Sequence, residues 1–555
     1  MSEQKNTTAH FGKEATTALV TGLNIVAQAV SKTLGAAGST VVIQREDGKF
    51  PIITKDGVSV AKEIHPKDEK VRLGADLAIS IATKQMDSVG DGTTTATVLG
   101  NAIVTQGVRQ IELSENTVNL TALRKGMEKA KDWTIEELNK MSKKINSQDQ
   151  LINIATVSAN GDEKLGKVVA DAYEKVGKNG VVMVEECKDR DIRLEVKEGM
   201  TFPKGWTSQF FVNNHETQTV EYDNPKILLC NTKISSFATL ARIIEPVMKS
   251  GSPIVLVAED FDTSVTQGLA MNILRSGGQI KVACVPAPGY GDRRLDILRD
   301  MGIYLGATVA DDPMGTAFEA ITAVDFGSCE KIIIKKDETV ISGGKGDSEK
   351  VAERIKAIQG MIDNLKENDT FEKEQLNKRL ATLTTGVAVI KVGGSSEEEI
   401  KELRDRLDDA QCAVKASLES GYLPGAGNTL LLLSSKVQNA VKADSEDEAL
   451  GIKIFANALK SPFKTILKNA GIDSTEIMNA IIVKDDISYG YDARALQLCD
   501  LFEAGIIDPL KVVTGAVYAA TSIASVALTS SVIITEDPIE EKGGLNLSMM
   551  PGPMM

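Results

Sequence analysis

The sequence predicts a multidomain, helix-rich α+β protein in which an α/β middle is nested between two helical ends. The chain has 555 residues, which is too long for a single hydrophobic core and suggests roughly two to four domains. Apolar residues recur at helical spacing in residues 17–35, and residues 397–420, after the α/β middle, read as a helix rich in paired charges. From about residue 177 to 212 the pattern becomes strand-rich, and alternating strands and helices follow, as is typical of α/β packing.

The composition restricts the class of protein. The chain carries 77 acidic and 63 basic residues, a net charge of -14, which argues against a general nucleic-acid binder. No stretch contains the roughly 18 uninterrupted apolar residues of a membrane span, and the polar start lacks the order of a signal peptide. Six scattered cysteines and three histidines predict free thiols without a disulfide framework or a zinc site. We expect a cytoplasmic protein with no nucleic-acid or membrane partner.

The first elements alternate helix, glycine turn and strand. Residues 17–35 are predicted as a helix that Gly35–Gly38 ends, and residues 39–44 read as a strand, so this turn is one possible phosphate loop. Lys55–Gly57 follows a short strand and, taken alone, is typical of an ordinary turn. A helix over residues 71–88 leads into the next loop.

The loop Gly90–Gly92 precedes Thr93–Thr95 and an apolar run through Ile103 that reads as a helix. Glycines let the backbone turn tightly, and the first N–H groups of a helix, with its dipole, suit a phosphate. Asp91 would hold the accompanying divalent cation. No Lys-Ser or Lys-Thr pair closes the loop, so it is not a Walker A motif. Because Asp and Thr are also good N-cap residues, a simple helix cap remains open as the alternative.

The middle of the chain alternates strands and helices after charged amphipathic helices over residues 105–145. A highly charged stretch, residues 349–383, is broken near Asp369 and is predicted as a helical hairpin with a solvated face. The expected strands and helices between these stretches are strands 180–184, 194–196, 227–229 and 254–257 and helices 239–250 and 264–276.

The C-terminal part reverts to helices. The charged helix 397–420 ends at Gly421, and Pro424–Gly427 is a third glycine-rich turn. The final residues, 537–555, are rich in Gly, Met and Pro, cannot form a packed core and are expected to be disordered.

Seven motifs carry a resemblance to a known family. TLGAAG, ITKDGVSVAKEI, GDGTTTATVLG, APGYGDRR, GVAVIKVGG, GYDARAL and GIIDPLKV occur in the order, and near the spacing, of group I chaperonins. The chain therefore resembles the family of the bacterial 60 kDa chaperonin over nearly its whole length, the Met-rich tail included.

The resemblance implies a three-layer subunit built from a helical equatorial ATPase domain, a hinge-like intermediate domain and an α/β apical client-binding domain. The expected boundaries are 1–137 and 420–536 for the equatorial domain, 138–197 and 388–419 for the intermediate domain, 198–387 for the apical domain and 537–555 for the tail.

The resemblance also implies an ATPase coupled to protein folding, with ATP, Mg²⁺ and K⁺ as cofactors. The residues implied around the phosphates are Thr33, Leu34, Gly35, Ala36, Lys55, Asp91, Gly92, Thr93, Thr94 and Thr95, with Asp91 as the Mg²⁺ ligand. The residues implied around ribose and base are Gly425, Ala426, Asp492, Ala493, Arg494 and Asp508.

Two carboxylates are implied as catalytic, Asp56 and Asp409. A carboxylate that orients water in line with the γ-phosphate is what phosphoanhydride hydrolysis needs. Without the resemblance, Asp409 on its charged helix would be read as solvated. Because Asp409 falls in the intermediate segment, it is expected to reach ATP only when the hinge closes.

The implied client-binding surface departs from the family pattern. Its residues are Trp206, Ser208, Phe210, Phe211, Ala241, Ile244, Thr266, Ala270 and Met271. Ala241, Thr266 and Ala270 are smaller or more polar than the aliphatic residues usual there, which predicts a weaker or differently tuned groove and puts dependence on a co-chaperonin lid in doubt. Ordinary core packing is the alternative for Phe210 or Phe211.

Other departures fall in the nucleotide site. Ala36-Ala37 stand where the family has Pro-Lys, Asp492 where it has Asn, and Arg494 where it has a small residue. An Asp accepts hydrogen bonds but cannot donate them, so nucleotide affinity or selectivity is expected to change. The chain resembles a divergent member, such as a paralogue or a virus-encoded copy acting in its host's cytoplasm.

Assembly and partners follow from the resemblance as well. Unfolded or partly folded clients are held best by several copies, which implies a homo-oligomeric ring of seven subunits, single or double, with allosteric coupling. Asp162 and Arg406 match a pair that sets the hinge in the family. Two other classes remain as alternatives: a small-molecule kinase, and an ATP-binding holdase or scaffold ring without a folding cycle.

Overall fold

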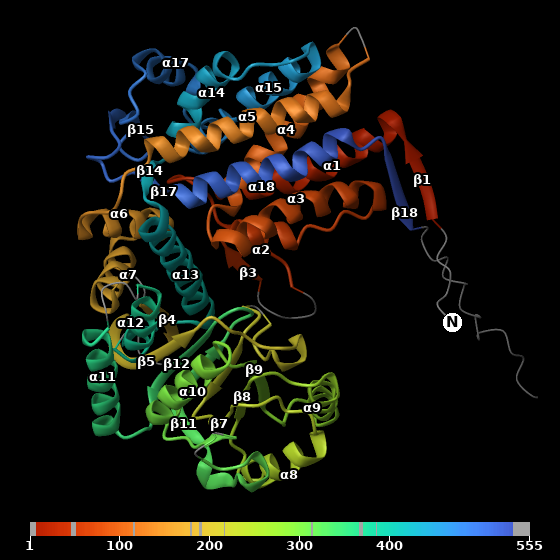
Figure 1. The fold of residues 1–555 in the computed structure, drawn as a ribbon. Coiled ribbons are helices and arrows are strands. Elements are labelled where there is room, and N and C mark those ends of the chain that lie inside the picture. Colours follow the sequence, from red (N-terminus) through yellow and green to blue (C-terminus); the bar gives the residue numbers. More distant parts are fainter. Residues whose placement is uncertain are drawn as a thin grey trace, which may run out of the picture. The chain divides into compact units, whose positions relative to one another are not determined.

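The computed structural model describes residues 7–536 except 46–50, 115–116, 178–179, 188–190, 216, 312, 314, 366–369 and 385. The tail 537–555 lies outside the described residues, so its expected disorder stays a prediction. The chain forms two compact units, unit 1 from Met1–Ala170 with Gly394–Met555, and unit 2 from Asp171–Gly393. Unit 2 is inserted in the sequence of unit 1, as the nested pattern predicts (Figure 1).

Unit 1 is built mainly from long helices packed around one apolar core, with buried Leu123, Phe455 and Val517 among its members (Figure 1). The helices are α1 (Gly12–Ser31), α2 (Gly57–Lys62), α3 (Glu69–Val89), α4 (Thr93–Leu113), α5 (Leu120–Met141), α6 (Gln148–Ser158), α7 (Glu163–Val176, which crosses into unit 2), α13 (Glu397–Ser420), α14 (Asn428–Ala440), α15 (Glu446–Ala458), α16 (Ser461–Asn469), α17 (Ser474–Lys484) and α18 (Leu510–Thr529). The predicted helices 17–35, 71–88 and 397–420 correspond to α1, α3 and α13.

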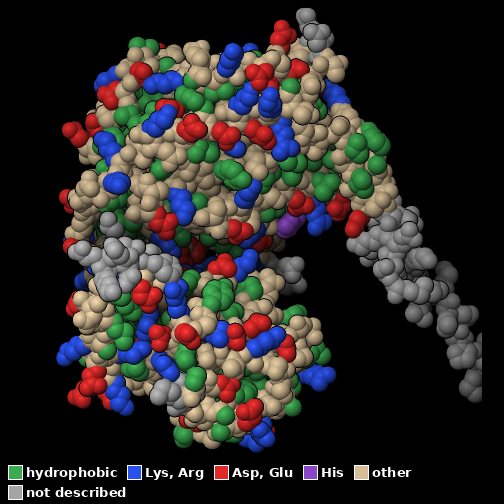
Figure 2. Space-filling view, viewed as in Figure 1, with side chains coloured by type: hydrophobic (Ala, Val, Ile, Leu, Met, Phe, Trp, Pro, Cys, Tyr) green, Lys and Arg blue, Asp and Glu red, His purple; other side chains and the backbone are tan. Residues whose placement is uncertain are grey.

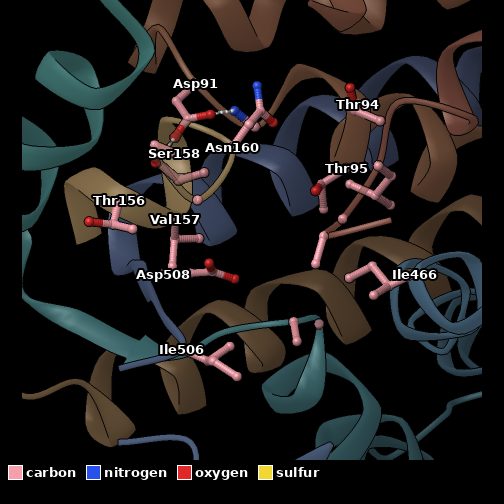
Figure 3. A pocket seen from close by; sticks show the side chains of 18 of the residues that line it. Asp91, Thr94, Thr95, Thr156, Val157, Ser158, Asn160, Ile466, Ile506 and Asp508 are labelled. Carbon is pink, nitrogen blue, oxygen red and sulfur yellow. Dashed lines mark hydrogen bonds between the residues drawn. The ribbon is translucent and has the colours of Figure 1, made fainter. Parts of the chain in front are cut away.

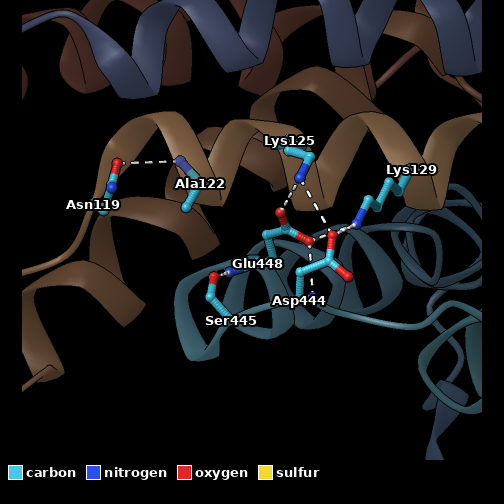
Figure 4. Close-up of polar contacts among 7 residues, drawn as sticks. All are labelled: Asn119, Ala122, Lys125, Lys129, Asp444, Ser445 and Glu448. Carbon is cyan, nitrogen blue, oxygen red and sulfur yellow. Dashed lines mark hydrogen bonds and ion pairs between the residues drawn. The ribbon is translucent and has the colours of Figure 1, made fainter.

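The contact between α5 and α15 shows how these helices are held. A Cβ added at Gly126 would lie 2.1 Å from the carbonyl oxygen of Glu448, so the two backbones touch there. The buried Glu448 carboxylate accepts hydrogen bonds from the ammonium groups of Lys125 at 2.7 Å and Lys129 at 2.6 Å (Figure 4). These bonds lower the pKa of Glu448 to about 2.

In the described part of unit 1, four two-stranded antiparallel sheets accompany the helices. Their strands are β1 (Thr7–Phe11) with β18 (Val532–Glu536), β2 (Val41–Ile43) with β3 (Ile52–Thr54), β14 (Tyr422–Pro424) with β17 (Ile507–Pro509), and β15 (Tyr489–Asp492) with β16 (Gln497–Asp500). The β14–β17 pair places Leu423 opposite Asp508, and therefore brings the third glycine-rich turn beside the start of α18.

Helix α18 is the one helix in the described part of the chain that is long and apolar enough to cross a membrane by length and composition. It packs against α3, α4 and α5, and 61% of its apolar window is buried inside the structure. The criterion of uninterrupted apolar residues missed this helix because polar residues such as Thr514 and Ser522 interrupt it. Its packing is that of a core helix.

Unit 2 is organised by a ten-stranded mixed sheet in the order β4-β13-β5-β12-β11-β7-β8-β9, with β10 beside β7 and β6 beside β11. Strands β7, β8 and β9 run parallel, and β5, β12 and β11 are antiparallel neighbours. The strands are β4 (Val181–Glu186), β5 (Arg193–Phe202), β6 (Val220–Asp223), β7 (Lys226–Cys230), β8 (Ile254–Ala258), β9 (Val282–Pro286), β10 (Val309–Ala310), β11 (Gly327–Ile334), β12 (Thr339–Gly344) and β13 (Gly386–Val392).

The core of unit 2 lies against this sheet. Strands β7 and β8 are almost wholly buried, which confirms the predicted buried strands 227–229 and 254–257. Helices pack around β7 to β9 and along the rest of the sheet (Figure 1). They are α8 (Phe237–Met248), α9 (Thr263–Arg275), α10 (Asp292–Leu305), α11 (Ser348–Asp363) and α12 (Thr370–Thr384), with short 3₁₀ turns at Gln209–Phe211, Phe318–Ala320 and Ala323–Asp325.

The charged hairpin α11–α12 corrects one expectation. Its predicted break near Asp369 falls outside the described residues, but two of its charges are not solvated. The buried Asp300 carboxylate of α10 accepts hydrogen bonds from Arg354 at 2.6 Å and from Arg379 at 2.8 Å. Arg379 also bonds Asp296 at 2.9 Å. This ionic cluster ties both helices of the hairpin to α10.

The surface of both units mixes acidic and basic side chains over the face seen in Figure 2, without one large patch of a single sign. The compact units also divide the segments expected to form a hinge: α6 and the whole of α13 belong to unit 1, whereas β4 and β13 lie in the sheet of unit 2. The three-domain boundaries therefore stay a prediction.

Candidate functional site

Unit 1 contains a cavity of about 680 Å³ lined by segments from both ends of the chain. The predicted site residues on its wall are Thr33, Leu34, Gly35, Ala36, Lys55, Asp56, Asp91, Gly92, Thr93, Thr94, Thr95, Asp409, Ala426, Asp492, Ala493, Arg494 and Asp508. Only Gly425 of the predicted nucleotide set is not on the wall; a Cβ there would lie 2.9 Å from Asp508 Oδ1, so Gly425 lies directly behind that carboxylate.

The Gly90–Gly92 loop ends α3 and begins α4. Both glycines have positive φ, 83° and 80°, and a Cβ at Gly90 would lie 2.5 Å from the Cys412 sulfur, so the tight turn needs glycine. Helix α4 starts at Thr93 with Gly92 as its N-cap and no side-chain cap hydrogen bond. The alternative of a simple Asp or Thr cap is therefore wrong, and the first N–H groups of α4 remain free for a ligand in the cavity.

The Asp91 carboxylate has two hydrogen-bond partners. One oxygen accepts from the N–H of Gly92, and the other accepts from the Ser158 hydroxyl at 3.0 Å (Figure 3). Burial raises the pKa of Asp91, and the charge of Asp56 adds to this, while the two hydrogen bonds oppose it. A nearby cation would stabilise the ionised form of a buried carboxylate such as this one.

Asp56 has a structural partner as well as a place on the wall. It is the N-cap of α2, and its two carboxylate oxygens accept from the N–H groups of Val58 at 3.2 Å and Ser59 at 2.8 Å. A Cβ at Gly57 would lie 2.3 Å from the Thr94 hydroxyl. The Lys55–Gly57 turn thus packs directly against the start of α4 and is more than an isolated turn.

Asp409 projects into the same cavity from α13. Burial raises the pKa of Asp409 well above its usual range, and the charges of Asp91 and Asp56 raise it further. Helix α13 belongs to unit 1 and places the Asp409 carboxylate on the cavity wall together with the phosphate loop, and the expectation that Asp409 reaches ATP only when a hinge closes stays a prediction.

Asp508 is the middle residue of β17 and faces the cavity (Figure 3). Burial and the charge of Asp91 raise the pKa of Asp508 to about 7. Four carboxylates, those of Asp56, Asp91, Asp409 and Asp508, therefore line one cavity beside a helix N-terminus.

These four carboxylates fit a hard divalent cation whose other ligands come from a bound phosphate. No group of three or more His, Cys, Asp or Glu side chains in the described part of the chain is placed to hold a metal ion by itself. Mg²⁺ is commonly held by one or two carboxylates together with substrate phosphates and water. Burial is the main cause that raises the pKa of Asp91 and of Asp409, and neighbouring carboxylates add to it, so a bound cation would stabilise the charged form of both.

The hairpin β15–β16 forms another part of the wall. The Asp492 carboxylate accepts from the N–H groups of Arg494 at 2.7 Å and Ala495 at 3.1 Å, so one of its oxygens shapes the turn. The Arg494 guanidinium donates to the carbonyl of Asn160 at 3.1 Å, and a Cβ at Gly161 would lie 1.5 Å from it. Arg494 thus bridges the hairpin and the turn after α6.

The α6 side of the wall was not predicted. Thr156, Val157, Ser158, Asn160 and Gly161 all line the cavity (Figure 3). In the sequence they are a run of small and polar residues at a helix end, with no spacing that relates them to the Gly90–Gly92 loop. Only the tertiary packing brings them to Asp91.

The expected hinge pair is not formed. Arg406 pairs with Glu402 on its own helix, and Asp162 accepts from the N–H groups of Lys164 and Leu165 at the start of α7. The structure describes both side chains of the expected pair, and each one bonds a group close to it in sequence instead.

The residues expected to bind clients lie in unit 2 and differ in their exposure. Phe211 and Ile244 are buried in its core, and Ala270 is buried as well, so these three present no apolar surface in this structure. Core packing, the alternative for Phe211, is what the structure shows. Phe210 is 60% exposed, and Met271 and the unpredicted Leu274 are exposed on α9. The remaining expected residues, Trp206, Ser208, Ala241 and Thr266, are half-buried.

Comparisons with known proteins identify the family of the chain. Residues 26–538 match the TCP-1/cpn60 chaperonin family. The mitochondrial chaperonin homolog Hsp-60 of Caenorhabditis elegans is 41% identical over 535 residues, which span 96% of this chain and 93% of that protein. The fold is similar to that of the chaperonin gp146 from the bacteriophage EL 2 (Pseudomonas aeruginosa), crystallised in the presence of ATP-BeFx, with a TM-score of 0.64, 19% identity and coverage of 96% and 99% of the two chains. The chain therefore belongs to the TCP-1/cpn60 chaperonin family, as its motifs predict.

Proposed function

We propose that this chaperone binds and hydrolyses ATP in the unit 1 cavity and uses the energy to fold non-native proteins held on unit 2. The observation that carries the proposal is the meeting of the uncapped α4 N-terminus with Asp91 and Asp409 in one cavity. A helix N-terminus suits phosphate, and crowded carboxylates suit a cation and a water molecule. The phage chaperonin of the same fold was crystallised with an ATP analogue, which supports the choice of nucleotide.

Each part of the wall has a proposed task. The N–H groups of Thr93 to Thr95 and the Thr33–Ala36 turn bind phosphate oxygens, and Lys55 adds positive charge. Bound Mg²⁺, with Asp91 as its protein ligand, would neutralise phosphate charge. Asp409 orients the attacking water. Asp56, whose carboxylate is fixed at the N-terminus of α2, adds a second negative charge near that water.

At the other end of the cavity, Asp508, Ala426 and the β15–β16 hairpin contact the sugar and base. Gly425 lets Asp508 approach, since any side chain there would meet its carboxylate. K⁺ as a further cofactor stays a prediction from the family resemblance.

Client capture is proposed for the exposed apolar residues Phe210, Met271 and Leu274 of unit 2. Non-native chains share exposed apolar surface, and an apolar patch on the chaperone binds it without sequence specificity. Because Phe211, Ile244 and Ala270 are buried, the patch is smaller than the resemblance implied. The expected reduction in dependence on a co-chaperonin lid therefore remains part of the proposal.

Ring assembly is supported by two small sheets in unit 1. Within the described residues, β1–β18 and β2–β3 have two strands each, so both keep free edges. Phe11 is 65% and Ile534 is 63% exposed on the first, and Val42 and Ile53 are exposed on the second. Unpaired edges with apolar side chains favour pairing with another chain. We propose that neighbouring subunits pair these sheets in a closed ring of identical copies, seven by resemblance, in one or two layers.

The compartment is a separate matter. One relative is mitochondrial and another is encoded by a phage, so the cytoplasmic placement, including that of a virus-encoded copy, stays a prediction.

The experiment that tests the proposed function is refolding of a chemically denatured client enzyme, with and without ATP and with no lid protein added. Recovery of client activity only with ATP supports a self-sufficient folding chaperone. ATP hydrolysis without recovery favours the alternative of a holdase or scaffold ring, or a missing lid. Absence of nucleotide binding by the assembled protein would overturn the proposal.

A further inference from the structure

Gln85 is a fully buried polar residue on α3 that takes no part in the cavity wall. A buried carboxamide is costly unless its polar atoms find partners. Within the described residues the Gln85 nitrogen has two partners and its oxygen has none, so the contacts of the nitrogen are informative. It lies one helical turn before the Gly90–Gly92 loop, behind the residues proposed to hold phosphate and cation.

The carboxamide nitrogen of Gln85 reaches two backbone carbonyls from different segments. It donates to the carbonyl of Asp91 at 2.7 Å and to the carbonyl of Val512, in the first turn of α18, at 3.2 Å. Asp91 and Val512 both line the cavity. Two acceptors fix the orientation of the amide, because a reversed amide would place its own oxygen against two carbonyl oxygens.

The space around this amide is kept open by glycine. A Cβ at Gly92 would lie 3.1 Å from the Gln85 nitrogen, and a Cβ at Gly515 on α18 would lie 2.8 Å from its oxygen. Gly515 has no unusual backbone conformation that demands glycine, so its lack of a side chain makes room for Gln85.

We propose that Gln85 is a positioning residue that clamps the nucleotide loop to α18. The clamp holds the Asp91 carbonyl toward α3, while the Asp91 carboxylate, held by Gly92 and Ser158, stays on the cavity side. Asp91 is thereby fixed from both ends before any cation binds. The inference rests on the proposed nucleotide site, and it adds that the C-terminal helix sets the geometry of the cation ligand.

We expect the clamp on the Gly90–Gly92 loop to affect nucleotide affinity more than the rate of the hydrolysis step. Without the clamp, the loop samples other positions, and nucleotide with its cation must pay the cost of ordering it. We therefore expect weaker binding of Mg·ADP and a higher KM for ATP, with a smaller change in kcat at saturating ATP and Mg²⁺.

The test compares Gln85→Leu, which keeps the bulk and removes the amide, with Lys84→Met as a matched control. The Lys84 ammonium donates to the Ser522 hydroxyl at 2.9 Å, and so joins the same two helices without contacting the loop. Amide hydrogen exchange over residues 88–94 is measured in the nucleotide-free assembled protein, and Mg·ADP affinity by calorimetry. We expect faster exchange and about tenfold weaker binding in Gln85→Leu, a factor that corresponds to ~1.4 kcal/mol, and no change of either in Lys84→Met.

A second variant keeps the inference testable if Gln85→Leu does not fold. Gly515→Ala leaves the amide in place but pushes it from its site, so it should show the same pair of effects more weakly. Unchanged exchange and affinity in both folded variants, or equal changes in Lys84→Met, would overturn the clamp. Failure of the wild-type protein to bind Mg·ADP would instead contradict the proposed function, and the exchange measurement would still decide whether the clamp exists.

Discussion

Replacing Asp300 with Asn should destabilise unit 2 strongly. The Asp300 carboxylate is buried and accepts hydrogen bonds from Arg354 and Arg379, which hold α11 and α12. Removal of one partner from a buried ionic cluster costs about 3–5 kcal/mol, because the remaining charges are left uncompensated. The lower value, about 3 kcal/mol, applies here, since Arg379 keeps Asp296 and the Arg354 side chain is already 21% exposed and can turn to water.

The chain offers a clean assay for this change. It has two tryptophans, Trp133 in unit 1 and Trp206 in unit 2. Changing one tryptophan to Phe leaves the other as the fluorescence reporter of its own unit. With a urea dependence of about 2–3 kcal/mol per M, the loss of about 3 kcal/mol shifts the unfolding midpoint of unit 2 down by about 1–1.5 M.

Two comparisons make the result decisive. Asp296→Asn removes a more exposed carboxylate that bonds only one side of the cluster, and should shift the midpoint by a third of that amount or less. The Trp133 signal should not move in either variant. A shift for Asp300→Asn below about 0.4 M, or an equal shift of both reporters, would refute the idea that this cluster holds the hairpin to unit 2.

Three further predictions concern other contacts. The pKa of Glu448 is lowered to about 2, so the ionised carboxylate stabilises unit 1 fully above pH 4.5, the ordinary pKa of a glutamate, and this stabilisation is lost as the pH falls toward 2. Glu448→Gln should therefore flatten the dependence of unit 1 stability on pH between these two values. An unchanged acid-unfolding curve would contradict this prediction. Arg494→Ala removes the bridge to Asn160 and should speed release of a fluorescent ADP several-fold in stopped flow, whereas an unchanged rate would show that the bridge does not restrain the cavity wall. Phe210→Ser should weaken capture of a denatured client without changing the free energy of unfolding, because Phe210 is exposed. Phe211→Ser should lower the free energy of unfolding by about 3 kcal/mol or more, because Phe211 is buried in the core. The opposite pattern would rule out the assignment of Phe210 to the surface and Phe211 to the core.

The long periodic segments could be predicted because their signals are local. Helix 397–420 matches α13 at both ends, since Ser396 caps it and Gly421 ends it. The apolar runs of β7 and β8 were readable as buried strands for the same reason. Local pattern therefore gave the element types and the nesting of the two units.

The cavity wall was predictable only in part. The Gly90–Gly92 loop carries a local signal, and family resemblance supplied Asp409 and Asp508. Ser158 and Gln85 carry none, because a serine at a helix end and a glutamine inside a helix have many ordinary explanations. Their partners lie 67 and 427 residues away in sequence, in the bonds from Ser158 to Asp91 and from Gln85 to Val512.

Burial was the other limit. Phe210 and Phe211 are adjacent in an aromatic pair, and only the 3₁₀ turn at Gln209–Phe211 decides which side chain enters the core. The solvated face expected for the charged hairpin was wrong for a related reason: charge density predicts exposure on average, but Arg354 and Arg379 find a buried carboxylate on a helix that precedes them by about 50 residues or more.

The central claim, that the unit 1 cavity performs ATP hydrolysis with Asp409 as the water-orienting group, is tested most directly by single-turnover hydrolysis. Asp409→Asn keeps the shape of the side chain, and Asp408→Asn on the same helix, outside the cavity wall, serves as the control. Nucleotide binding is measured in parallel for all three proteins. We expect Asp409→Asn to bind ATP as well as the wild type but to hydrolyse it at least about 100-fold more slowly, while Asp408→Asn does both normally. Hydrolysis by Asp409→Asn at the wild-type rate would contradict the central claim.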